Sequence, residues 1–196
     1  MSFDKLLIVS AEEDVRWLRT RGVDVNPGLT DDELAQVEHR FGFRFSVDHR
    51  AFLSVGQPVG GRWWDWRGPA SPLEEALAWP RAGVLWDVEN DDYWAPSWGV
   101  RPSSLRARLE AANGFLDDWP VLVPLYGHRY VPAAPASASA PVFSVWQTDV
   151  IAYGENLGDY LRREFGDRDE QAGTPSVDSR ACPPWSLFAT GQEELI

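Results

Sequence analysis

The sequence predicts an α+β fold in which helices pack on a mixed or antiparallel sheet. Capped helical patterns come first along the chain, and apolar strand-like runs follow in its second half. The 196 residues suffice for roughly one domain, and 44% hydrophobic residues can form a core without a disulfide or a metal. We therefore expect one compact domain with extensions at its ends.

Helix start signals are clearest in the first third of the chain. Thr30 and Glu33 have the spacing of a capping box, and Gly42 is suited to end the helix that follows. A similar signal predicts a helix from Ser10 to Thr20, and apolar spacing predicts another in Asp48–Val55.

Further helices are expected beyond this region. A helix that begins at Ser71 should stop before Pro80, because proline cannot donate a backbone hydrogen bond. Pro102 opens another helix, and the last one begins near Asn156.

Strands are expected in four apolar or aromatic runs. These runs are Arg62–Trp66, Val121–Tyr126, Phe143–Trp146 and Val150–Tyr153. A loop rich in Ala, Ser and Pro (131–141) separates two of them, and a polar loop (166–184) precedes Trp185, Leu187 and Phe188, which should dock back onto the body.

The charge balance limits the kinds of partner. The 18 basic and 30 acidic residues give a formal charge of −12, which disfavours nucleic acid and anionic membranes and favours a basic protein. Cys182 is the only cysteine, so neither an internal disulfide nor a cysteine-based zinc site is expected. The chain shows no signal peptide and no apolar run that could span a bilayer, so we expect a cytoplasmic protein.

Tryptophans suggest where a partner would bind. The chain has eleven, several of them crowded between positions 63 and 98, where acidic residues also gather. Tryptophans supply contact area at interfaces, and carboxylates steer a basic partner. We therefore expect a partner-binding patch formed by Trp64, Asp65, Trp66, Asp87, Glu89, Asp91, Asp92 and Trp94. The alternative is a strand buried on one face and covered by a loop on the other.

Signals for an enzyme are few. No histidine pair has metal-ligand spacing, no nucleophile elbow or phosphate-binding loop occurs, and we expect no cofactor and no metal. His128 is the one candidate general base, if Asp149 or Asp65 lies beside it, although a structural role is the alternative. Cys182 is expected in a mobile tail without catalytic function. A tryptophan-rich surface could also stack against sugars, which leaves a sugar-binding module open.

Two groups of segments, in the same order, resemble the SUKH superfamily. They are Gly28–Leu34, Val37-Glu38, Phe41-Gly42-Phe43 and Asp48–Leu53 in the first group, and Val123–Tyr130, Val145–Val150, Tyr153-Gly154 and Leu157–Phe165 in the second. The sequence departs from the family pattern at Ser46, where proline is usual, and in the loop after Tyr130, which looks like an insertion. The resemblance covers residues 28–165.

This resemblance implies a single SUKH-like domain at 28–165, preceded by a helical extension (1–27) and followed by a loop and docked tail (166–196). It also implies a non-catalytic protein, most often a bacterial immunity protein that binds and neutralises a toxin. A basic nuclease-type toxin would suit the acidic charge. A regulatory scaffold that binds a cellular partner is the alternative, an enzyme or sugar-binding module is a further one, and the chain could be a monomer or a homodimer.

Overall fold

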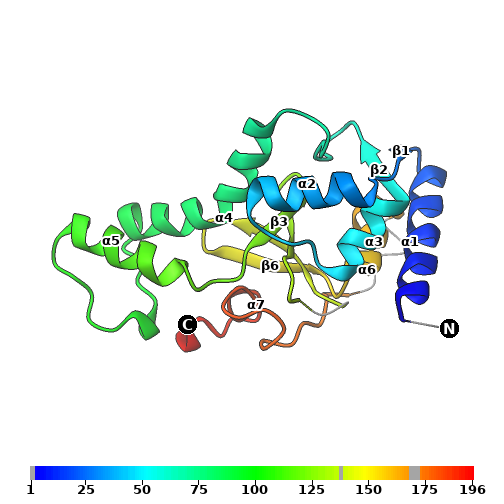
Figure 1. The fold of residues 1–196 in the computed structure, drawn as a ribbon. Coiled ribbons are helices and arrows are strands. Elements are labelled where there is room, and N and C mark those ends of the chain that lie inside the picture. Colours follow the sequence, from blue (N-terminus) through cyan, green and yellow to red (C-terminus); the bar gives the residue numbers. More distant parts are fainter. Residues whose placement is uncertain (1–2, 137–138, 168–172) are drawn as a thin grey trace.

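The α+β class is confirmed by the computed structural model, which describes residues 3–136, 139–167 and 173–196 (Figure 1). The expected loops at 131–141 and 166–184 therefore lie partly outside the described residues. In chain order, the elements are α1 (Phe3–Thr20), β1 (Asp24–Pro27), α2 (Asp31–Phe41), α3 (Val47–Val55), β2 (Gly56–Val59), α4 (Ala70–Asn90), η1 (Pro96–Trp98), α5 (Leu105–Leu116), β3 (Leu122–Tyr126), β4 (Arg129–Pro132), β5 (Val142–Trp146), β6 (Asp149–Gly154), α6 (Leu157–Phe165), α7 (Trp185–Ala189) and η3 (Glu193–Leu195).

The sheets are antiparallel throughout the described chain. Four strands form the main sheet in the order β3-β4-β5-β6, and β1 pairs with β2 in a separate two-stranded ribbon. The strand expected over Arg62–Trp66 is not formed. In this segment the structure has an isolated bridge between Trp63 and Tyr126 at the β3 edge, because the chain turns away after it.

Both faces of the main sheet are covered by hydrophobic clusters. Successive side chains of a strand point to opposite faces, so Val131 of β4 joins one cluster and its neighbour Tyr130 joins the other. The first cluster includes α1, α3 and α6, and the second includes α4, α5 and α7. This arrangement explains why the strand at 122–126 is a continuous apolar run rather than an alternating one.

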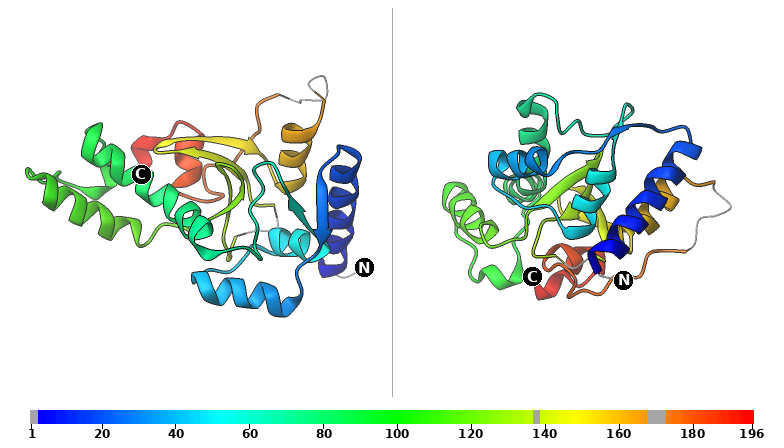
Figure 2. Two further views of the ribbon diagram at one scale, coloured as in Figure 1. Left: turned by 90° about the horizontal axis from the view of Figure 1, so that it is seen from above. Right: turned by 45° about the vertical axis from the view of Figure 1, so that its right-hand side comes forward.

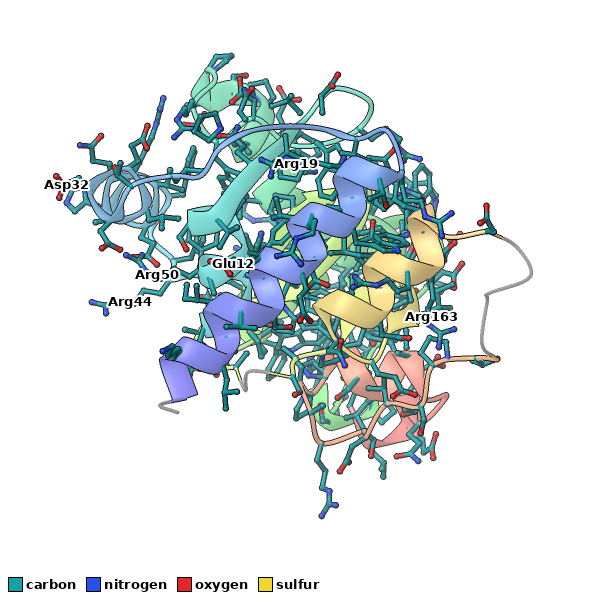
Figure 3. All side chains as sticks on the ribbon, turned by 90° about the vertical axis from the view of Figure 1, so that its right-hand side faces the viewer. Glu12, Arg19, Asp32, Arg44, Arg50 and Arg163 are labelled. Carbon is teal, nitrogen blue, oxygen red and sulfur yellow. The ribbon has the colours of Figure 1, made fainter. Side chains whose placement is uncertain are left out.

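The first and last helices of the described chain, α1 and α7, belong to the folded body. The expected N-terminal extension contains α1, whose Val15 and Leu18 are buried in the first cluster. Figure 3 shows α1 lying beside α6. At the other end, Trp185 and Phe188 of α7 are buried in the second cluster, which confirms that the tail docks back.

One of the two capping signals in the first third of the chain is confirmed. Thr30 and Glu33 form the reciprocal capping box of α2, with hydrogen bonds of 3.2 and 2.8 Å. Gly42 ends the helix with a φ of 71°, a conformation that glycine adopts without steric cost. The helix start expected at Ser10 is wrong, because α1 already begins at Phe3 and Ser10 lies inside it.

Helix α4 corrects one expectation, since it continues through Pro80 to Asn90. Proline removes the N–H that would bond to the Ala76 carbonyl four residues earlier. That buried carbonyl instead accepts a 3.0 Å hydrogen bond from the hydroxyl of Tyr130 on β4. The sheet therefore supplies the donor that the helix lacks. Beyond this point, α4 and α5 project as an arm away from α1 (Figure 1, Figure 2).

Replacing Tyr130 with Phe should expose the importance of this hydrogen bond. The variant leaves the Ala76 carbonyl buried without a donor, which should lower the free energy of unfolding by about 1–3 kcal/mol. Urea denaturation followed by circular dichroism measures the loss. Tyr153→Phe is the matched control, because no hydrogen bond of its hydroxyl is recorded in the described chain. Equal stabilities for the two variants would contradict the account.

A buried histidine packs against two residues of the first cluster and should make the fold sensitive to acid. His49 of α3 is fully buried, with its ring 5.0 Å from Phe45 and 6.3 Å from Trp66 between centroids. Neither ring nitrogen has a hydrogen-bond partner among the described residues. Burial lowers the pKa of His49 to about 3, so the folded state excludes the charged imidazolium.

Acid should therefore destabilise the wild type more than a His49→Phe variant. The unfolded chain takes up a proton below a pKa of about 6.5, whereas the folded chain does so only near the lowered pKa. The contribution that the neutral His49 makes to the free energy of unfolding is fully present above about pH 6.5 and is lost as the pH falls toward 3. The stability difference between variant and wild type should shift by about 2 kcal/mol between about pH 8 and pH 5.

The comparison with the variant is needed because two carboxyl groups act in the opposite direction. Burial raises the pKa of Asp14 and of Asp48, so the folded state binds their protons more readily. These two groups are present in both proteins and cancel in the difference. A difference that stays constant with pH, measured by urea titration, would show that His49 is not excluded from protonation in the fold.

Candidate functional site

A groove lined by tryptophans lies where the N-terminal half of α4 meets the β3–β4 turn and the end of β5. Its volume is about 300 Å³. We call it the aromatic groove, and its lining residues are Arg62, Trp64, Pro72, Glu75, Ala76, Trp79, Gly127, His128, Tyr130 and Trp146.

Two of the most exposed aromatic rings in the described chain form its wall. Trp146, the last residue of β5, is 55% exposed, and Trp79 of α4 is 40% exposed. Their ring centroids lie 5.4 Å apart, with the planes tilted by 59°. Large apolar rings that remain exposed together in a concave site typically mark a binding surface.

Close packing of α4 on the β5–β6 turn brings these rings together. A Cβ atom at Gly83 would lie 2.7 Å from the Cα atom of Gln147, so a side chain here would force the two elements apart. One helical turn further on, the buried carboxylate of Asp87 accepts hydrogen bonds from the N–H and the hydroxyl of Thr148, at 2.8 and 2.6 Å. These contacts fix the end of β5 against the helix.

The β3–β4 turn forms another side of the groove. The Trp64 indole N–H donates to the carbonyl of Gly127 at 3.2 Å, and the Gly127 N–H donates to the carbonyl of Arg62 at 2.9 Å. Gly127 has a φ of 54°, and a Cβ there would lie 2.6 Å from the Arg62 guanidinium. Glycine therefore suits the left-handed backbone of the turn and leaves room for the guanidinium of Arg62.

His128 lies between two guanidinium groups. Its Nδ1 atom is 2.9 Å from Nη2 of Arg62, and its Nε2 atom contacts Nη1 of Arg129. Partial burial lowers the pKa of His128, and the charges of Arg129 and Arg62 lower it further. The imidazole is therefore neutral near pH 7.

The pairing of His128 with Asp149 or Asp65 is not formed. The side chain of Asp65 instead accepts hydrogen bonds from Gln57 Nε2 at 2.8 Å and from the backbone of Arg67 at 3.0 Å. No hydrogen bond joins Asp149 to the histidine in the described chain. Without a carboxylate to stabilise its charged form, and with two cations beside it, His128 is poorly suited to act as a general base.

The eight residues of the expected patch do not form one surface. Trp64 lines the aromatic groove. Trp66, expected to contact a partner, is instead buried against Phe43 and Phe45. Asp87 is likewise a buried structural anchor, as its bonds to Thr148 show.

Glu89, Asp91 and Asp92 lie at or just after the C-terminal end of α4, whereas Trp64 lies against its N-terminal half. Glu89 and Asp91 are exposed there. Asp92 pairs with Arg101 and with Arg108, which lowers the pKa of its carboxyl group, and Trp94 donates its indole N–H to the Gly99 carbonyl at 2.9 Å.

The tail cysteine also differs from expectation. Cys182 is buried in the second cluster rather than mobile, because α7 folds back over the sheet edge. Burial raises the pKa of its thiol to about 12, so the reactive thiolate is disfavoured.

Sequence reasoning missed the residues that complete the groove, above all Glu75, Trp79 and Trp146. A signal exists for Trp146, which directly precedes the Gln147-Thr148 hairpin turn, where an exposed tryptophan has no core to enter. No comparable signal marks Trp79, whose exposure depends on how α4 docks.

Comparisons with known proteins give no family for this chain: no protein-family model, no curated protein and no solved structure matches it. No group of three or more His, Cys, Asp or Glu side chains suited to a metal occurs among the described residues. Within the same residues, no helix is both long enough and apolar enough to cross a membrane.

Proposed function

We propose that this protein is a non-catalytic binding protein of the SUKH immunity type, which neutralises a basic protein toxin by holding it at the aromatic groove. The observation that carries the proposal is the pair of exposed rings of Trp79 and Trp146, fixed side by side in a concave site.

The composition of the groove supports protein recognition. Tryptophan and arginine are the side chains most enriched among residues that dominate binding energy at protein interfaces. The groove contains three tryptophans and Arg62, and the hydrogen bond from the Trp64 indole to the Gly127 carbonyl holds one of these four side chains in place before a partner arrives. Preorganised side chains lose less conformational entropy on binding.

The charge of the chain supports a basic partner. The formal charge is −12, and exposed carboxylates that contribute to it include those of Glu89, in the last turn of α4, and Asp91, directly after the helix. Glu75 adds a carboxylate on the groove itself. The negative field of these charges raises the association rate of a basic protein and weakens as salt screens it. A nuclease-type toxin fits this negative field, because a nuclease needs basic residues to attract the phosphates of its substrate.

The sequence resemblance supports the immunity role, and a cytoplasmic location would place the protein where such a toxin acts. A regulatory scaffold would use the same groove for a cellular partner. A sugar-binding module is the second candidate, favoured by the exposed Trp79 and Trp146 rings, since sugars also stack on tryptophan.

Replacing Trp146 with Ala should weaken the complex at least about 30-fold, since a central tryptophan at an interface contributes about 2 kcal/mol or more. The partner is captured from the native host at low salt, and its affinity is measured by calorimetry. Trp86→Ala is the matched control, because Trp86 is a 46% exposed tryptophan that lies on α4, as Trp79 does, but outside the aromatic groove. It should change the affinity less than about threefold.

Tests on the captured partner and on the same variants distinguish the candidate functions. A captured basic protein that arrests growth when produced alone, and not when produced with this chain, supports the immunity role. Harmless captured proteins support a scaffold, and binding of oligosaccharides that is lost in Trp146→Ala supports the sugar-binding module. Equal loss of affinity in the Trp146 and Trp86 variants would contradict the placement of the site.

A further inference from the structure

The two guanidinium contacts of His128 cannot both be ordinary hydrogen bonds. A neutral imidazole has one lone-pair nitrogen that accepts and one N–H that donates. Guanidinium groups only donate, yet Nδ1 faces Arg62 and Nε2 faces Arg129. One of the two contacts therefore places donor against donor.

The surroundings of Arg129 identify which contact is the hydrogen bond. Its side chain is 11% exposed and fixed by Ser144 Oγ at 3.0 Å, by Glu164 at 3.4 Å and by the ring of Tyr153, 3.9 Å below its guanidinium. These contacts hold Arg129, which does not line the groove. Its N–H therefore donates to Nε2, which leaves the proton of His128 on Nδ1.

Two donors then face each other at the end of the aromatic groove. Nη2 of Arg62 and the Nδ1–H of His128 are 2.9 Å apart, and both residues line the groove. An acceptor that approached from the groove would receive a hydrogen bond from each of them and would remove the donor-to-donor contact. Because one of the donors is a cation, an anionic acceptor is preferred.

We propose that this end of the groove binds a carboxylate whose apolar or aromatic body lies against Trp79 and Trp146. A carboxylate offers two oxygens to two donors. A phosphate dianion fits less well, because Glu75 lines the same groove and the chain carries a formal charge of −12. This inference rests on the proposed function, in which the carboxylate belongs to an acidic side chain of the protein partner.

Glu75 does not itself occupy this end of the groove. Its oxygen accepts a long, 3.5 Å hydrogen bond from Ser71 on the same helix, and no ion pair joins it to Arg62 in the described chain. Its charge acts on the bound carboxylate only as a repulsive neighbour.

Phenylacetate is a suitable probe, with phenylacetamide as its neutral counterpart. In spectra of the indole N–H groups, with resonances assigned from Trp→Phe variants, phenylacetate should shift Trp79 and Trp146 with a dissociation constant of about 1–10 mM. Phenylacetamide should bind at least about tenfold more weakly than phenylacetate, because it cannot form the charge-assisted hydrogen bonds.

Three variants locate the effect. Arg62→Gln should abolish the preference for phenylacetate over phenylacetamide, and Glu75→Gln should strengthen phenylacetate binding by removing a like charge. Arg44→Gln is the matched control, because it also removes one exposed arginine, but Arg44 does not line the groove and projects outward (Figure 3). It should leave the preference unchanged.

Equal binding of the two probes, no shift with either, or a preference that survives Arg62→Gln would overturn the inference. These outcomes leave the proposed function standing if the protein partner is still captured and still depends on Trp146. Conversely, a specific phenylacetate site in a chain that captures no protein would support the carboxylate site and overturn the protein-binding role.

Discussion

The hydrogen bond from the Tyr130 hydroxyl to the Ala76 carbonyl joins the longest helix to the main sheet. Pro80 would otherwise leave that carbonyl buried and unpaired, at a cost that favours ending the helix. Because the sheet supplies the donor, α4 continues past the proline and crosses the β5–β6 turn. The close approach at Gly83 and the bonds of Asp87 then become possible, and both the aromatic groove and the α4–α5 arm follow from this docking.

The groove combines two features that are usually separate. Its wall is apolar and aromatic, while one end presents Arg62 and the Nδ1 side of His128 in a chain with a net charge of −12. Long-range attraction would bring a basic partner to the surface, whereas short-range hydrogen bonds would select a particular acidic group on it. The association rate with the partner and the specificity of binding would thus depend on different residues of the same protein.

Sequence signals predict this structure well where a residue acts on its own neighbours. The capping box at Thr30 and the end of α2 at Gly42 need only local bonding, and the strand at 122–126 follows from its apolar run. The continuation through Pro80 could not be predicted, because its compensating donor lies fifty residues further along the chain. For the same reason the buried role of Asp87 was not visible: its partner is Thr148, on a turn that only the tertiary fold brings near.

Hydrogen–deuterium exchange of the chain alone and in complex with its captured partner tests the central claim most directly, because it reports on every segment at once. Our account predicts slower exchange on binding in the segment around Trp64, in the first half of α4, in the β3–β4 turn and at the end of β5. Helices α1 and α6, which lie at the opposite end from the arm, should be unchanged (Figure 1, Figure 3). Protection confined to α1 and α6, or to the α4–α5 arm, would show that the partner binds elsewhere and that the aromatic groove is not its site.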